Sequence, residues 1–74
     1  MQYDYAKLNG KIVEVCGTQS VFAKEIGRSE RSVSLKLNNK IDFKQSEIDD
    51  AVCVLGINPS DIGEYFFKRK VQNF

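Results

Sequence analysis

The residues of this sequence that could do chemistry are few, and they favour binding over catalysis. Histidine is absent, and the only cysteines, Cys16 and Cys53, stand far apart in the chain. A zinc site or a catalytic thiol needs nitrogen or sulfur partners close by, and these residues cannot supply them. Asp49 and Asp50 are adjacent, so on a helix they diverge by about 100° and make a poor acid-base pair. We therefore expect no enzyme, no metal, no cofactor and no small-molecule substrate.

The distribution of charge points instead to a polyanionic or protein partner. The net charge is only +1, but residues 24–44 hold six bases against three acids, and residues 45–67 hold five acids and no base. Lys68, Arg69 and Lys70 then restore positive charge near the end. A basic middle and an acidic rear can orient a protein on a phosphate backbone.

The apolar residues recur at steps of three and four, which predicts an all-α fold of five helices. Thr18 and Ser29 are expected to cap the second and third helices, and Asn58 before Pro59 to start the fifth. Gly17, Gly27, Asn38–Asn39 and Gly56 are the expected helix stops. The predicted core stripes are Tyr5, Leu8, Ile12 and Val15; Phe22, Ala23 and Ile26; Val33 and Leu37; Ile48, Ala51, Val52 and Leu55; and Ile62, Tyr65 and Phe66.

The size of the chain and its cysteine content indicate one domain in a reducing compartment. We expect residues 1–74 to form a single domain, with a basic and aromatic tail at 68–74 that could be extended over residues 71–74. Both thiols should be buried and free. No window is apolar enough for a membrane span, and no targeting signal is seen, so a cytoplasmic location is expected. Phe67 and Phe74 are left for a dimer contact, for packing on the first helix, or for a partner.

The most informative segment is 18–38, where two short helices are joined with almost no connecting chain. A helix-turn-helix needs a small residue where its helices cross, a residue tolerant of positive φ in the turn, and an apolar anchor in the second helix. Ala23, Gly27 and Val33 stand at these positions. We therefore predict a helix-turn-helix formed by the second and third helices.

On these residues the sequence resembles the lambda repressor and Cro type helix-turn-helix family over residues 5 to 66. The stretch SERSVSLKLNNK followed by Asp42 and Phe43 is especially similar to the small lytic-switch regulators of temperate phages of Gram-positive bacteria, which are Cro-like or modulator-of-repression proteins. The resemblance implies that Gln19 contacts backbone phosphate and braces the recognition helix. Arg28 and Lys36 depart from the family pattern, which often has apolar residues there.

The third helix supplies the predicted contact surface. At about 100° per residue, Arg31, Ser34, Leu35 and Asn38 share one face, opposite Val33 and Leu37. Arg31 can pair with guanine and Glu30 can accept from cytosine, while Leu35 can pack on a thymine methyl group or on a protein. Lys36, Asn38, Asn39 and Lys40 are expected near a phosphate strand at the helix exit. Ser29 is also expected to cap the helix and Asn38 to stop it. The full set of expected DNA- or partner-binding residues is Gln19, Ser29, Glu30, Arg31, Ser32, Ser34, Leu35, Lys36, Asn38 and Lys40.

Two functions are compatible with this surface. The leading hypothesis is a Cro-like regulator that binds a double-stranded DNA operator, as a homodimer on a two-fold site, and acts by steric exclusion. The alternative is an antirepressor that uses the same surface to capture the DNA-reading domain of a phage repressor. The near-neutral charge, Glu30, an exposed Leu35 and the aromatic tail fit the alternative.

Overall fold

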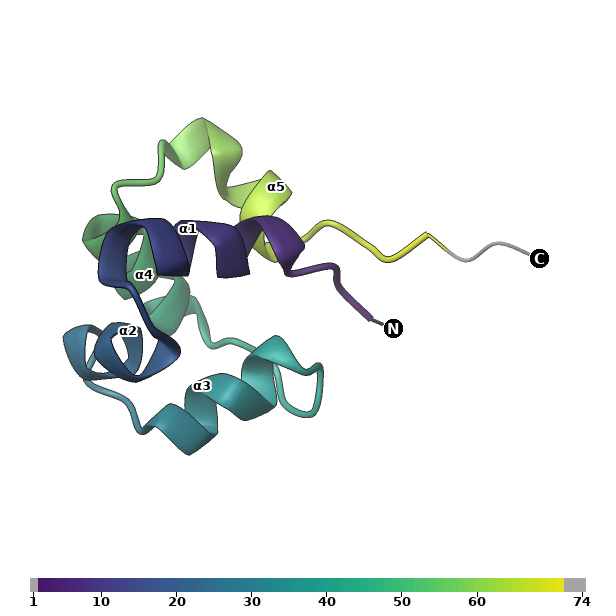
Figure 1. Ribbon diagram of the computed structural model, residues 1–74. Coiled ribbons are helices and arrows are strands. Elements are labelled where there is room, and N and C mark those ends of the chain that lie inside the picture. Colours follow the sequence, from purple (N-terminus) through teal and green to yellow (C-terminus); the bar gives the residue numbers. More distant parts are fainter. Residues whose placement is uncertain (1, 72–74) are drawn as a thin grey trace.

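The computed structural model describes residues 2–71 and contains five α-helices, as the sequence predicts (Figure 1). Three helices precede the acidic part of the chain. A short 3-10 turn, η1, leads into the last helix, and the described residues include no strand. The elements are α1 (Ala6–Cys16), α2 (Gln19–Glu25), α3 (Glu30–Leu37), α4 (Gln45–Leu55), η1 (Pro59–Asp61) and α5 (Ile62–Phe66).

The predicted caps and stops set the ends of these helices. The Thr18 hydroxyl accepts the Val21 N–H at 3.2 Å, and the Ser29 hydroxyl accepts the Ser32 N–H at 3.1 Å. Gly27 has a φ of 71°, which glycine adopts without the steric cost that a Cβ brings. The chain can therefore reverse between α2 and α3 within four residues, so the local signals for this turn are confirmed.

The end of α3 does more than stop a helix. Asn39 has a φ of 61°, in the left-handed region that asparagine tolerates better than most residues. Its side chain accepts the Tyr3 N–H at 2.8 Å and donates to the Tyr3 carbonyl at 3.0 Å. The predicted helix stop thus also fastens the N-terminal segment to the end of α3.

All five helices contribute to the core, and one predicted core residue of α1, Val15, lies outside it. Leu8 and Ile12 are fully buried, but Val15 is 45% exposed and Cys16 packs on the core instead. From Leu8 the stripe advances by four residues at each step, so Cys16, one turn after Ile12, takes the inward position that was expected for Val15. The buried apolar residues are Tyr5, Leu8, Ile12, Phe22, Ala23, Ile26, Val33, Leu37, Ala51, Leu55, Ile57 and Phe66, with Ile48, Val52, Ile62 and Tyr65 half-buried against them.

The cysteines are both free, but the prediction that both are buried is wrong. Cys16 is half-buried, and burial together with the nearby Glu25 carboxylate raises the pKa of its thiol. Cys53 is exposed, because Ala51 and Leu55 point toward the core and Cys53, halfway between them on α4, lies on the opposite side of the helix.

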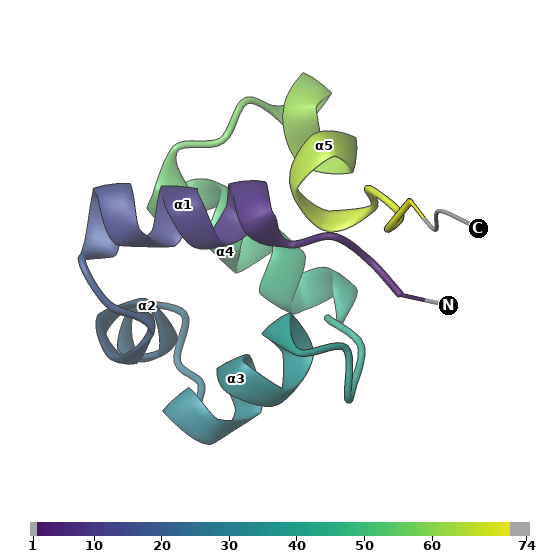
Figure 2. The same cartoon turned by 45° about the vertical axis from the view of Figure 1, so that its right-hand side comes forward.

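The two ends of the chain run side by side (Figures 1 and 2). The Asp4 N–H donates to the Lys68 carbonyl at 2.6 Å, the Lys70 N–H donates to the Gln2 carbonyl at 3.2 Å, and Tyr3 and Arg69 form an isolated antiparallel bridge. The extended pairing therefore precedes the predicted stretch at 71–74, of which residues 72–74, including Phe74, lie outside the described residues. Phe67 is 52% exposed and packs edge-on against Tyr3.

Candidate functional site

The predicted pair of crossed helices is present at α2 and α3. Ala23 is 1% exposed where the helices meet, and Val33, on the inner side of α3, is fully buried. The Arg28 N–H donates to the Ala23 carbonyl at 2.8 Å, which closes the turn through Gly27. The lower part of Figure 1 shows α3 at the edge of the molecule, where one of its sides faces outward.

The outer side of α3 carries most of the residues that the sequence placed there. Glu30, Arg31 and Asn38 are exposed, and Ser34 is half-buried. The Asn38 amide donates to the Ser34 carbonyl at 2.8 Å, as expected for a residue at the helix end. Leu35 is half-buried instead of exposed, yet it lies outside the core cluster of the described residues. The predicted contact face is therefore formed, with its apolar residue partly covered.

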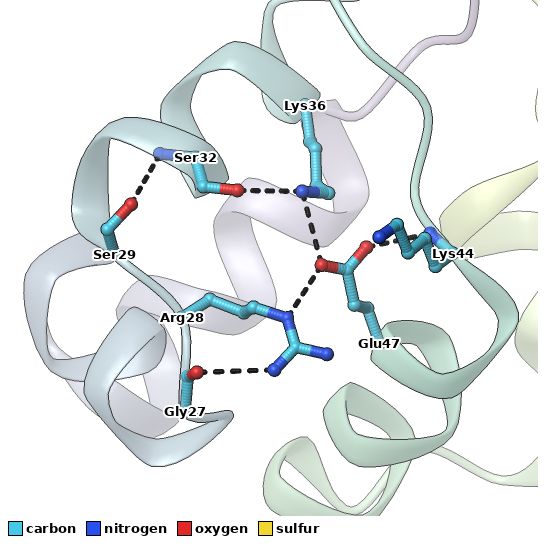
Figure 3. Close-up of polar contacts among 7 residues, drawn as sticks. All are labelled: Gly27, Arg28, Ser29, Ser32, Lys36, Lys44 and Glu47. Carbon is cyan, nitrogen blue, oxygen red and sulfur yellow. Dashed lines mark hydrogen bonds and ion pairs between the residues drawn. The ribbon is translucent and has the colours of Figure 1, made fainter.

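Lys36 is not at the surface, so its predicted place near a phosphate strand is wrong. The residue is 5% exposed. Its ammonium group lies 3.1 Å from the Glu47 carboxylate and donates to the Ser32 hydroxyl at 2.7 Å (Figure 3). Positions 33, 36 and 37 fall on one side of a helix, so Lys36 occupies an inward position and needs a buried partner. Ser32 is engaged in the same contact and is half-buried.

Glu47 is the centre of this polar cluster, which we call the Glu47 cluster and which comprises Arg28, Ser32, Lys36, the Lys44 backbone and Glu47 (Figure 3). The Glu47 carboxylate is 2% exposed; it accepts the Arg28 Nε–H at 2.8 Å and the Lys44 N–H at 2.7 Å. Burial opposes its charge, but the Lys44 N–H and the Arg28 and Lys36 side chains outweigh burial and hold the pKa of Glu47 below its usual range. The cluster therefore ties α3 and the turn before it to α4.

The Glu47 cluster changes the charge of the surface around α3. Two of the six bases in residues 24–44, Arg28 and Lys36, pair with one acid from the acidic rear. The other four, Lys24, Arg31, Lys40 and Lys44, are exposed, as are the acids Glu25, Glu30 and Asp42. The basic middle segment predicted from the sequence is thus nearly balanced at the surface.

The remaining predicted contact residues have mixed positions. The Gln19 amide donates to the Asn9 side chain at 3.3 Å. Gln19 therefore braces α2 against α1, whereas the resemblance implied that it braces α3. Ser29 is exposed and caps α3, and Lys40 is exposed just beyond that helix. Contacts of these residues with DNA or with a protein stay predictions.

Sequence reasoning missed a second surface feature beside α4. Edge-on contacts link Tyr5 to Phe43 at 5.4 Å and Phe43 to Phe66 at 5.3 Å between ring centroids. Two hollows, of about 230 and 430 Å³, adjoin these rings and share Phe43, Ile48 and Phe67. We call the joined hollows the aromatic groove. Its only sequence signal is the clustering of aromatics near the ends of the chain and at position 43, because the helices that bring them together are distant in sequence.

The described residues offer neither a metal site nor a membrane-spanning helix. Residues 2–71 contain no group of three or more His, Cys, Asp and Glu side chains that could hold a metal ion. Within the same range, none of the helices has both the length and the apolar character needed to span a membrane.

Comparisons with known proteins place this chain in a family. The sequence model of DUF739, described as protein of unknown function, matches residues 1–69. The chain belongs to the DUF739 family. A solved structure also matches this DUF739 protein: the solution structure of the modulator of repression (MOR) of the temperate bacteriophage TP901-1 from Lactococcus lactis, at 58% sequence identity. The match covers 97% of each chain with a TM-score of 0.80. Curated proteins give no match.

Proposed function

We propose that this DUF739 protein is an antirepressor, which binds the DNA-reading domain of a phage repressor and keeps that repressor from its operator. The observation that carries the proposal is the 58% identity, over 97% of both chains, to a protein named modulator of repression. Such identity over the whole length extends to surface residues as well as to the core. The proposed activity is binding, with no chemical step and no cofactor.

The charge around α3 supports a protein partner over DNA. Binding to DNA draws most of its affinity from lysine and arginine side chains that neutralise phosphates. Here Arg28 and Lys36 face Glu47, and the exposed Glu30 stands beside Arg31 at the start of α3. A surface of mixed charge suits a protein interface, which is about as apolar as the average protein surface and pairs charges of both signs.

The outer side of α3 is the expected contribution of the helix-turn-helix to this interface. Leu35 keeps part of its side chain in water outside the core cluster, between the polar residues Arg31 and Asn38 of the same side. An apolar side chain ringed by polar groups is a common arrangement at the centre of a protein contact. We therefore expect Leu35 to be covered by the repressor.

The proposed function is tested with a candidate repressor, for which the first choice is the product of any repressor gene found next to the gene for this chain. Size-exclusion chromatography and calorimetry of the two proteins should show a stable complex. Leu35→Ala should weaken it by about tenfold, the loss expected from truncating one buried apolar contact of ~1.4 kcal/mol. Val13→Ala is a matched control, because Val13 is 61% exposed on α1. Absence of a complex at micromolar concentrations would exclude the antirepressor function.

A Cro-like regulator is the second candidate, and the exposed Arg31 near the N-terminus of α3 is the observation in its favour. A guanidinium at this place can form a bidentate contact with guanine, worth ~1–3 kcal/mol of discrimination. Gel shifts with the DNA that flanks the gene, at low and moderate salt, separate the two candidates. We expect only weak binding without sequence preference. Tight operator binding by the protein alone, abolished by Arg31→Ala but not by Lys24→Ala, would establish the Cro-like function instead.

A further inference from the structure

The aromatic groove lies between the loop that follows α3, the start of α4, and α5. Phe43 lies in the loop, Ile48 in α4 and Ile62 in α5, and Phe67 directly follows α5. The larger hollow of about 430 Å³ is lined mostly by these apolar side chains. Ile48 and Ile62 are half-buried and Phe67 is 52% exposed, so the groove presents apolar surface to water. A hollow lined by apolar side chains can take up an apolar side chain of a partner.

The charged residues that line the groove are both acids. Asp42 lines the smaller hollow and Asp49 lines the larger one, and both carboxylates are exposed. Neither hollow is lined by a lysine or an arginine of the described residues. The groove therefore suits an apolar side chain that is flanked by positive charges, and it repels a phosphate backbone.

The groove is continuous with the end of α3. A third hollow is lined by Leu37, Asn38 and Asn39 of the α3 terminus and shares Tyr3 and Tyr5 with the smaller hollow of the groove. Asn39 holds Tyr3 in place by two hydrogen bonds, which fixes the border between the two regions. A single partner can thus contact the outer side of α3 and the groove at once.

We propose that the aromatic groove binds the basic DNA-binding surface of the repressor, with an apolar side chain in the hollow and flanking lysine or arginine residues paired with Asp42 and Asp49. This inference rests on the proposed antirepressor function and assigns its contact. A repressor reads DNA through a surface rich in bases, since phosphate contacts supply much of its affinity. That surface is complementary in charge to the groove. Binding there covers the side chains that the operator needs, so repressor and DNA exclude each other.

The test is a set of groove variants titrated against the DNA-binding domain of the candidate repressor. Asp49→Lys reverses one charge of the groove and should weaken the complex at least tenfold, because it removes a pair and adds a repulsion at the interface. Asp50→Lys is the matched control, since it makes the same change at the next, exposed position of α4, which does not line the groove. Its affinity should stay within threefold of the wild type.

Phe67→Leu tests the apolar half of the groove while keeping a side chain against Tyr3. We expect a loss of affinity of about tenfold, with an unchanged circular dichroism spectrum as the check on folding. If both groove variants bind the repressor domain as tightly as the wild type, the groove proposal is overturned and the antirepressor function stands. If the wild type itself does not bind, the proposed function fails first. Weakening by Asp50→Lys equal to that by Asp49→Lys would also overturn the proposal, because it would show a general charge effect.

Discussion

The Glu47 cluster and the aromatic groove contain neighbouring residues of α4, Glu47 and Ile48, but they differ in whether their carboxylates have partners inside the protein. In the cluster, the Glu47 carboxylate is 2% exposed and bonds to the Arg28 and Lys36 side chains and to the Lys44 N–H. No buried polar side-chain atom among the described residues lacks a hydrogen-bond partner. In the groove, the carboxylates of Asp42 and Asp49 are exposed beside apolar side chains.

The buried and the exposed carboxylates therefore have different roles. The buried Glu47 carboxylate pairs with the buried Lys36 and with the exposed Arg28, and these pairs join α3 and the turn before it to α4. Two of the exposed carboxylates, Asp42 and Asp49, line the hollows of the groove. We infer that the cluster serves folding and that the groove serves binding. Four experiments test this separation of roles.

Glu47→Ala should have the largest effect. Removing the carboxylate leaves the Lys36 ammonium buried without its counter-charge, and breaking a buried pair in this way costs ~3–5 kcal/mol. Urea unfolding followed by circular dichroism measures the loss. Glu14→Ala is the control, because it removes a carboxylate that is 68% exposed and pairs with Lys11 on the surface, a contact worth less than ~1 kcal/mol.

The double variant Glu47→Leu with Lys36→Met then separates folding from binding. It replaces the buried charges by apolar side chains of similar volume, an exchange that is often neutral for stability. It should be much more stable than Glu47→Ala and should bind the repressor domain as the wild type does. Loss of binding in a stable double variant would show that the cluster takes part in the contact.

Acidification should act on the cluster next. The pKa of Glu47 is lower in the folded protein than its ordinary value of 4.5, so its contribution to stability is complete above that value and is lost as the pH falls through the folded pKa. The free energy of unfolding should therefore decrease below about pH 4.5, and by less in Glu47→Gln, which has no proton to take up at this position. Equal acid dependence of the two proteins in urea titrations would place the acid sensitivity elsewhere.

Asp49→Asn should have the smallest effect on stability. The side chain is exposed, and a substitution at such a site usually changes the free energy of unfolding by less than ~0.5 kcal/mol. The same variant should weaken repressor binding measurably. A large loss of stability in Asp49→Asn would contradict the assignment of the groove to binding.

The sequence was sufficient for features that depend on neighbours along the chain. The caps at Thr18 and Ser29 and the turn at Gly27 follow from local hydrogen bonding and backbone freedom, and they were predicted correctly. The outer side of α3 followed from its period of 3.6 residues. The same period places Lys36 on the inner side of α3, beside Val33. The sequence nevertheless predicts a surface position for Lys36, because the partner that allows its burial, Glu47, lies on another helix.

The groove could not be predicted for the same reason. Phe43, Ile48, Ile62 and Phe67 belong to four segments, and only the packing of α4 against its neighbours brings them to one surface. The charge pattern was also misleading along the chain alone. It places Lys36 on a basic surface and Glu47 on an acidic one, whereas both side chains are buried and pair with each other, and the exposed Arg28 pairs with the same Glu47 carboxylate.

The central claim is that this protein opposes a repressor and does not replace it on DNA. The most direct test uses a labelled operator bound by the candidate repressor and follows the fluorescence anisotropy while this protein is added. We predict that the anisotropy falls to the value of free DNA as the repressor is taken up. A rise in anisotropy, or binding of the operator by this protein alone at moderate salt, would contradict it.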